Sequence, residues 1–171
     1  AIFVPVDPKE RYGCDLSPAE YFEAVYALYR EIIAKNANSM APALRASDIL
    51  KNREEGRLSA ILTLEDSVHL DGKIERVNDL FEKGVRMASF TWNYENSLAY
   101  PNSEDPEEHG RGLKPFGFEV VSKMNELGII VDVSHLSEGG FWDVARSSTK
   151  PFAASHSCAR ELCSHQRNLT D

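Results

Sequence analysis

Short apolar runs and amphipathic segments alternate along most of the chain. The apolar runs are too short for free-standing helices and are bounded by turn residues, so they are typical of strands buried on both faces. Strands are predicted at residues 1–6, 58–64, 85–91, 129–133 and 152–154. Apolar residues at helical spacing predict amphipathic helices between them. These helices are expected at residues 17–35, 73–83, 115–127 and 138–148, with a short helix at 47–54 inside the polar connection 36–57.

Strands that alternate with helices predict an α/β fold with a parallel sheet. A doubly wound sheet typically carries a glycine-rich phosphate loop after its first strand, and this sequence has none there. Its strands end instead in polar residues, as they do at the mouth of a (β/α)8 TIM-type barrel. A closed barrel needs about 250 residues, whereas this chain has 171. We therefore expect residues 1–171 to form one partial barrel domain with about five of the eight β/α units.

Three residues that can bind metal follow three of the predicted strands. Glu65 comes directly after one strand, and His135 and His156 follow two neighbouring ones. A histidine at a strand end is often only a hydrogen-bonded residue, and a strand-end carboxylate is often solvated or paired with an arginine. However, the carboxyl ends of parallel strands lie at one edge of a sheet, so two histidines in equivalent positions favour a metal site. A carboxylate with two imidazoles suits zinc, and the two carboxylate oxygens can bridge two ions.

Composition and charge exclude several classes of partner. The net charge is −8 and no cluster of lysine and arginine is present, so nucleic acid and anionic membrane surfaces are not expected to bind. No apolar run reaches the length of a membrane span. Three cysteines, Cys14, Cys158 and Cys163, are too few and too scattered for a disulfide scaffold, which favours a reducing, cytoplasmic location. The chain opens on a strand-like run without a leader, which leaves room for absent upstream sequence.

Four motifs in order resemble the membrane (renal) dipeptidase family. VDVSHLS followed by FAASHS is similar to the family's paired metal-histidine motifs, and the run GLKPFGFEVVSKMNELGIIVDVSH is similar to the turn and helix that lead to the first histidine. The segment ILTLEDSVHLDG resembles the one that carries the bridging glutamate, and HSCARELCSHQRN resembles the stretch whose arginine faces the substrate. The resemblance extends from about residue 58 onward and is weak before it.

The resemblance implies a zinc dipeptidase on a (β/α)8 barrel, which hydrolyses short peptides through a hydroxide that bridges two zinc ions. It implies Glu65 as the bridging ligand and catalytic residue, and His135 and His156, after the fifth and sixth strands, as metal ligands. Arg167 is then expected to bind the substrate. The residues after the preceding strand, Trp92, Asn93 and Tyr94, are expected to line the substrate pocket.

Three departures from the family pattern limit what this chain can do. The opening His-x-Asp pair and the late Asp are absent, so the chain is expected to correspond to about strands 2 to 6. It can then hold at most one of two zinc ions and is expected to be inactive alone. Unpaired sheet edges also favour association into a homo-oligomer. In addition, Trp92 stands where many members have a histidine.

Other interpretations remain open at this point. One is a related metal-dependent amidohydrolase, and another is a non-catalytic barrel that serves as a binding scaffold. His156 and Cys158 with Cys163 and His165 resemble a structural zinc site weakly, because tightly spaced cysteine pairs are lacking. His69 reads as a loop residue, and His109 as a solvent-exposed one.

Overall fold

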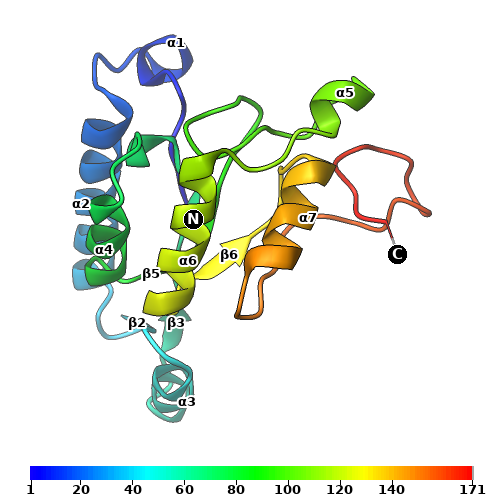
Figure 1. Ribbon diagram of the computed structural model, residues 1–171. Helices are drawn as coiled ribbons and strands as arrows, with labels where there is room; N and C mark the ends of the chain where they lie inside the picture. Colours follow the sequence, from blue (N-terminus) through cyan, green and yellow to red (C-terminus); the bar gives the residue numbers. More distant parts are fainter. Residues whose placement is uncertain (171) are drawn as a thin grey trace.

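The computed structural model describes residues 1–170 and shows an α/β arrangement with parallel strands (Figure 1). The main sheet contains four strands, β1 (Ile2–Phe3), β4 (Leu62–Glu65), β5 (Val85–Ser89) and β6 (Ile130–Asp132). They lie side by side in the order β1-β4-β5-β6, and every neighbouring pair is parallel. The order in the sheet is thus the order in the sequence, without the reversal that defines a doubly wound sheet. This confirms the α/β fold and the winding expected of a barrel.

The predicted strand at residues 152–154 is present only as a single bridge. Ala153 pairs in parallel with Asp132, Val133 N donates to Ala153 O (2.8 Å), and Ala153 N donates to Val131 O (2.9 Å). The backbone therefore continues the sheet beyond β6 at the expected place. This bridge brings the segment that carries His156 next to the one that carries His135.

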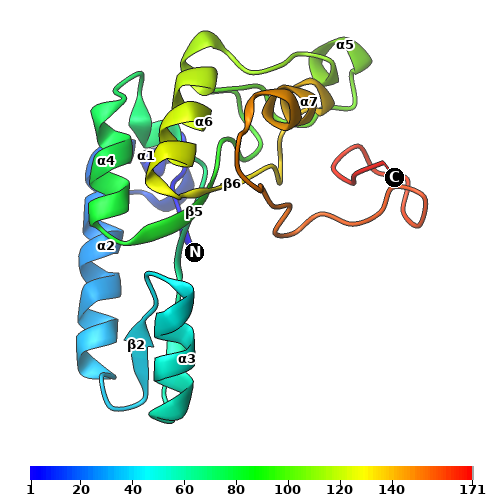
Figure 2. The same ribbon diagram turned by 60° about the horizontal axis from the view of Figure 1, so that its bottom comes forward.

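The helices connect successive strands and cover one face of the sheet. They are α2 (Pro18–Lys35), α4 (Glu75–Glu82), α6 (Pro115–Leu127) and α7 (Glu138–Ser147). Helix α6 packs against both α4 and α7, and α2 packs against β1, as Figure 1 and Figure 2 show from two sides. The core lies between the helices and the sheet and includes Leu64, Val77, Ala88, Val120 and Val131.

The ends of the helices follow the sequence signals. Ser17 caps α2 in a capping box with Glu20, whose carboxylate accepts from Ser17 N (2.9 Å). Gly128 ends α6 in the left-handed conformation, with φ of 80°. Only a residue without Cβ adopts that conformation at little cost, so this glycine turns the chain sharply into β6.

The region at residues 36–64 differs from the prediction. The expected strand at 58–64 divides into β3 (Leu58–Ala60) and β4, and β3 pairs in parallel with β2 (Met40–Pro42) in a separate two-stranded sheet. Helix α3 (Ala46–Glu54), close to the short helix expected at 47–54, connects β2 to β3, and the unit projects from the end of the main sheet in Figure 2. β2 is short and mostly polar around its ends, so its sequence carries little strand signal.

Three short helical pieces were also missed: α1 (Pro8–Tyr12), the 3₁₀ helix η1 (Val68–Leu70) and α5 (Pro106–His109). In α1 and α5 an aspartate caps the helix and a proline follows it, at Asp7-Pro8 and Asp105-Pro106. This pair is a helix start signal as well as a turn signal, but helices of four or five residues are too short to show an apolar stripe. None of the helices in residues 1–170 combines the length and apolar character needed to cross a bilayer.

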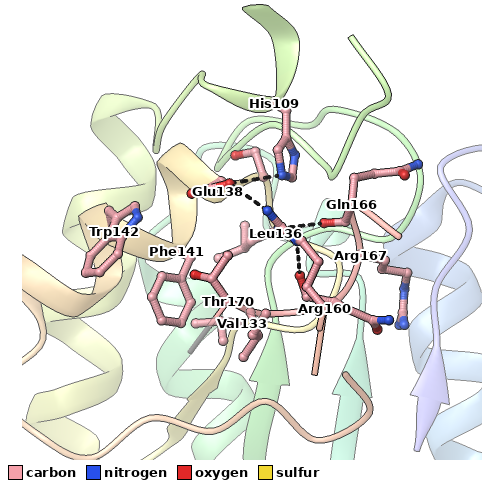
Figure 3. Close-up of a pocket in the computed structure, with 13 residues that line it drawn as sticks. His109, Val133, Leu136, Glu138, Phe141, Trp142, Arg160, Gln166, Arg167 and Thr170 are labelled. Carbon is pink, nitrogen blue, oxygen red and sulfur yellow. Dashed lines mark hydrogen bonds and ion pairs between the residues drawn. The ribbon is translucent and has the colours of Figure 1, made fainter. Parts of the chain in front are cut away.

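The C-terminal segment is attached to α7 through Arg160 (Figure 3). Arg160 donates to Glu138 Oε2 (3.1 Å), to Asn168 O (2.9 Å) and to Gln166 O (3.3 Å). His109 Nε2 lies 3.6 Å from the same Glu138 oxygen. The expected exposure of His109 is therefore wrong, because its side chain is largely enclosed beside this ion pair. These contacts fix the loop that carries Arg167.

Candidate metal centre

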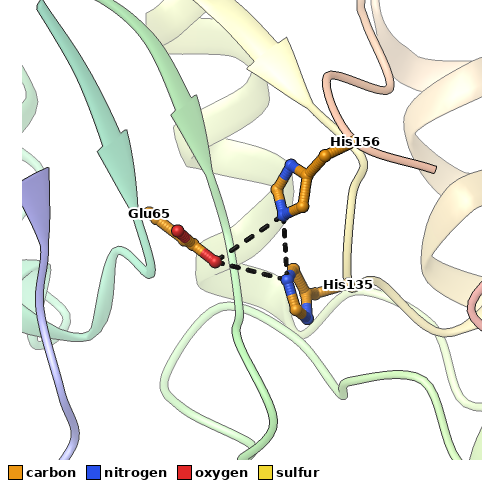
Figure 4. A group of neighbouring side chains, drawn as sticks. All are labelled: Glu65, His135 and His156. Carbon is orange, nitrogen blue, oxygen red and sulfur yellow. Dashed lines mark hydrogen bonds and ion pairs between the residues drawn. The ribbon is translucent and has the colours of Figure 1, made fainter. Parts of the chain in front are cut away.

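Three side chains from three different strand ends meet at the carboxyl edge of the sheet (Figure 4). Glu65 is the last residue of β4. His135 lies three residues after β6, and His156 lies three residues after the bridging Ala153. Within residues 1–170 they form the one group of three or more His, Cys, Asp or Glu side chains close enough to hold a metal ion. The structure therefore brings together the three residues that the sequence singles out.

The distances among the three donor atoms match a single small ion. His135 Nε2 lies 3.3 Å from Glu65 Oε1, His156 Nε2 lies 3.6 Å from it, and the two imidazole nitrogens are 3.0 Å apart. Zinc binds nitrogen and oxygen ligands at about 2.0–2.1 Å in tetrahedral sites, which separates neighbouring ligand atoms by about 3.3–3.4 Å. The donor set thus fits zinc in both chemistry and spacing, and three protein ligands leave a fourth position open.

Glu65 supplies the negative charge at the site. A hydrogen bond with His135 lowers the pKa of Glu65, and the nearby His135, His156 and Arg167 lower it further, although partial burial acts in the opposite direction. An anionic carboxylate beside two imidazoles is the form that a cation requires. Glu65 therefore offers a positive ion an anionic ligand, whereas the Arg167 guanidinium beside His135 acts against it.

The backbone at His135 is held in an unusual conformation. His135 has φ of 71°, in the left-handed region that non-glycine residues rarely adopt. Its carbonyl oxygen accepts from Asn102 N (2.8 Å), Asn102 Nδ2 (3.2 Å) and Thr91 Oγ1 (3.4 Å). Three donors on one carbonyl stabilise this turn, and backbone strain of this kind is concentrated at functional sites.

Arg167 lies directly against His135. Its Nε donates to His135 Nδ1 (3.2 Å), its Nη2 lies 2.6 Å from His135 Nε2, and its Nη1 donates to His156 O (2.9 Å). The structure thus places the predicted substrate-binding arginine at the metal group. Its guanidinium approaches the same His135 nitrogen that faces Glu65.

Aromatic residues form the neighbouring wall. The Trp92 ring lies 6.4 Å from the His135 ring, and Tyr94 lies 6.2 Å beyond it. Arg11 stacks on the Trp92 face at 4.5 Å and lines a pocket with Tyr12, Trp92 and Tyr94. Asn93 is exposed. Trp92 therefore adjoins His135, and Tyr94 adjoins Trp92 in turn, while the position of Asn93 shows no contact that assigns it a role.

A comparison with protein families decides the affiliation of this chain. The sequence model of the membrane dipeptidase family, peptidase family M19, matches residues 1–171. The chain belongs to the membrane dipeptidase family.

Relatives of this dipeptidase-family chain include named peptidases. It is 38% identical to dipeptidase aclJ of Aspergillus oryzae over 136 residues, and this match covers 77% of the chain and 32% of that protein. It is 33% identical over 147 residues to dipeptidase tcpJ of Claviceps purpurea, which covers 84% of the chain and 34% of that protein. An uncharacterized Klebsiella pneumoniae protein from the pqqA 5' region is 34% identical over 151 residues, which covers 85% of the chain and 55% of that protein.

Solved structures share the fold of this chain. A metallopeptidase from Rhodobacter sphaeroides, bound to a phosphinate mimic of the dipeptide L-Ala-D-Ala, superposes with a TM-score of 0.78 at 27% identity, over 90% of this chain and 44% of that one. The dipeptidase AC structure has a TM-score of 0.85 at 24% identity, over 99% of this chain and 53% of that one. The chain thus spans about a third to a half of the relatives that it matches.

The weaker metal site suggested by the sequence does not form among residues 1–170. His156 belongs to the group with Glu65, Cys158 and Cys163 are free and exposed, and His165 Nδ1 accepts from Arg167 N (3.1 Å). His69 is not an open loop residue: it is buried in η1, and its ring stacks on Phe22 at 4.6 Å.

Two buried carboxylates, Asp66 and Asp132, lie near the three residues of the metal group, and the sequence reasoning gave Asp132 no role. Asp66 accepts from Val68 N (2.9 Å), Trp92 N (3.0 Å) and Asn96 Nδ2 (3.0 Å), so it joins the loops after β4 and β5. Burial raises the pKa of Asp66 to about 7. Asp132, at the end of β6, contacts the segments of both histidines. The one available signal was an aspartate at a buried strand end, which says nothing of its partners.

Proposed function

We propose that Glu65, His135 and His156 hold zinc in a dipeptidase site. The triangle of donor atoms with separations of 3.0, 3.3 and 3.6 Å carries this proposal. It is supported by the family to which the chain belongs, whose structures include a metallopeptidase with a bound dipeptide mimic. Zinc would supply Lewis-acid polarisation of a peptide carbonyl and would lower the pKa of a water molecule.

The residues of this chain then have distinct tasks. His135 and His156 would each bind the ion through Nε2 and Glu65 through Oε1, and Glu65 would supply the negative charge. The other oxygen of Glu65 is the group that would bridge to a second ion. This assigns Glu65 a catalytic role as well as a binding role.

Arg167 is proposed to bind the anionic part of the peptide. Its guanidinium has the planar set of donors that fits a carboxylate or a developing oxyanion, and it lies beside both histidines. Trp92 and Tyr94 would contact the rest of the peptide, because they form the adjacent aromatic wall. Asn93 stays a candidate on its sequence position alone.

The hydrolysis of dipeptides is the direct test of this function. Because residues 1–171 span about a third to a half of their relatives, we propose that turnover needs the remaining barrel strands. Residues 1–171 with zinc should not hydrolyse a dipeptide panel that includes L-Ala-D-Ala. A chain extended to the full length of the family should hydrolyse some of them, and Glu65→Gln should abolish that turnover. An extended, folded and zinc-loaded chain that cleaves no dipeptide would contradict the proposal.

A related amidohydrolase activity is the second candidate. One structural neighbour is described as an amidohydrolase from Pseudomonas aeruginosa, with a TM-score of 0.81 at 25% identity over 88% of this chain. The same panel discriminates the two, because an amidohydrolase of another class would cleave non-peptide amides or lactones and leave the dipeptides intact.

A further inference from the structure

Asp132 is a buried carboxylate to which the proposed chemistry gives no task. It is 3% exposed, and its Oδ1 accepts from the backbone nitrogens of Ser134 and Ser155, both at 3.0 Å. Each of these serines directly precedes one of the two histidines of the metal group. A single carboxylate therefore joins both histidine segments.

A chain of side-chain hydrogen bonds leads from Asp132 to the ring of His156. Ser155 Oγ donates to Asp132 Oδ2, and the same Oγ lies 2.7 Å from His156 Nδ1. Ser134 Oγ accepts from His156 N (3.1 Å), so the backbone of His156 is held as well. The ring nitrogen on the far side, Nε2, is the one that faces Glu65 and His135.

The chemistry of these groups determines the direction of each bond. A carboxylate can only accept, and a serine hydroxyl has one proton to donate. Because Ser155 gives that proton to Asp132, its oxygen can only accept from His156. His156 Nδ1 must then carry the proton, which leaves a free lone pair on Nε2.

We propose that Asp132 is a positioning residue that acts through Ser155 to fix the tautomer of His156 with Nε2 free to bind a metal ion. Metal-binding histidines commonly donate their other ring N–H to a carboxylate, carbonyl or water, and this orients the ligand. Here a serine is interposed between the carboxylate and the histidine. The part of the proposal that concerns the ion rests on the proposed function, whereas the tautomer does not.

Asp132→Asn tests the relay with little change in shape. The amide oxygen can still accept from Ser134 N and Ser155 N, but its NH₂ group would donate to Ser155 Oγ. Ser155 would then donate to His156 Nδ1, which moves the ring proton to Nε2 and blocks the ligand lone pair. The expected results are a switch from Nδ1–H to Nε2–H in the ¹⁵N NMR spectrum of neutral, metal-free His156, and a 10- to 100-fold weaker zinc affinity.

Asp143→Asn is the matched control. Asp143 also accepts a backbone N–H, that of Leu113 (2.9 Å), but it lies on α7 outside the metal group. This variant should keep the His156 tautomer and the zinc affinity of the wild type. If Asp132→Asn does not fold, Ser155→Ala is used in its place. Ser155→Ala removes the hydroxyl that links Asp132 to His156 but keeps the two backbone N–H groups that donate to Asp132. Ser155→Ala should abolish the preference for Nδ1–H.

The two readouts separate failure of the relay from failure of the metal site. A folded Asp132→Asn or Ser155→Ala protein with unchanged His156 tautomer and unchanged zinc affinity overturns the proposal. Wild-type protein that binds no zinc, yet shows the tautomer switch in Asp132→Asn, supports the relay and contradicts the zinc function. Wild-type His156 with its proton on Nε2 overturns the relay whatever the metal affinity.

Discussion

At the scale of single residues, buried polar groups in this chain differ in whether their neighbours complete their hydrogen bonds. Asp66 and Asp132 accept three hydrogen bonds each from nearby donors. His69 is 4% exposed, and neither of its ring nitrogens has a hydrogen-bond partner within residues 1–170. Burial lowers the pKa of His69 to about 3. This histidine is therefore neutral in the folded protein at every pH near neutrality.

His69 should make the stability of the fold depend on pH. Its pKa is about 3 when folded and near 6.5 when unfolded, so between these values the unfolded state binds one more proton. Its contribution to stability is complete above pH 6.5 and is lost as the pH falls toward 3, by up to about 1.4 kcal/mol per pH unit. Urea denaturation between pH 4 and 6 gives the free energy of unfolding of wild type and of His69→Phe, and its dependence on pH should differ between the two proteins by this slope. The comparison removes the titration of Asp66 and of all other groups, because both proteins share them. Parallel curves for the two proteins would refute this assignment.

Arg167 should weaken the binding of a metal ion in this chain. Its Nη2 lies 2.6 Å from the His135 nitrogen that faces Glu65, so the guanidinium and a cation compete for the same nitrogen and repel each other. In Arg167→Ala we expect the zinc affinity to rise about three- to tenfold, because like charges near a protein surface repel by about 1 kcal/mol or more. Competition with a chromophoric chelator measures this. Arg160→Ala, which alters the same loop without removing a charge from His135, should not raise the affinity.

At the scale of elements, the apolar pattern predicts the strands and helices that are buried on one continuous face. It located β5, β6, α2, α6 and α7 because their core positions repeat at strand or helix spacing. It missed β2, α1 and α5, which are five residues or fewer and are fixed by pairing or capping rather than by an apolar face. It also placed β3 and β4 in one strand, because periodicity does not show which neighbour a strand pairs with.

The candidate site was predictable to a similar extent. Strand ends indicated that Glu65, His135 and His156 would meet, since parallel strands place their carboxyl ends together. The relay from Asp132 through Ser155 to His156 was not predictable, because it depends on side-chain directions in two segments joined by one bridge. The stacking of Arg11 on Trp92 depends likewise on a loop whose path the sequence does not specify.

The contact between α6 and the loop before it requires glycine at position 117. A Cβ there would lie 2.3 Å from Leu98 O, and that oxygen is fixed because it accepts from Lys114 N (2.8 Å). Gly117→Ala should therefore lower the free energy of unfolding by about 1–3 kcal/mol, as overpacking does. Ser122→Ala, on an exposed position of the same helix, should change it by less than about 0.5 kcal/mol. Equal urea midpoints for wild type and Gly117→Ala would contradict this, because they would show that α6 can shift away from Leu98 without loss of stability.

At the scale of the whole molecule, the four-stranded parallel sheet is an arc of the barrel fold of the membrane dipeptidase family. Strand β1 has one neighbour in this sheet, and the bridge at Ala153 ends its other side. Strand edges of this kind favour pairing with another chain, so association of copies is one expected way to cover them. Light scattering at several protein concentrations measures the molecular mass and should show a mass above that of one chain if copies associate.

The central claim is that Glu65, His135 and His156 bind a metal ion together, and zinc content per chain tests it most directly. Purified wild-type protein, loaded with zinc and passed through a desalting column, should retain about one zinc per chain. His135→Ala/His156→Ala should retain none, and His165→Ala, which removes an exposed histidine outside the group, should retain the wild-type amount. A folded wild-type protein without zinc, or a double variant that keeps it, would contradict the account.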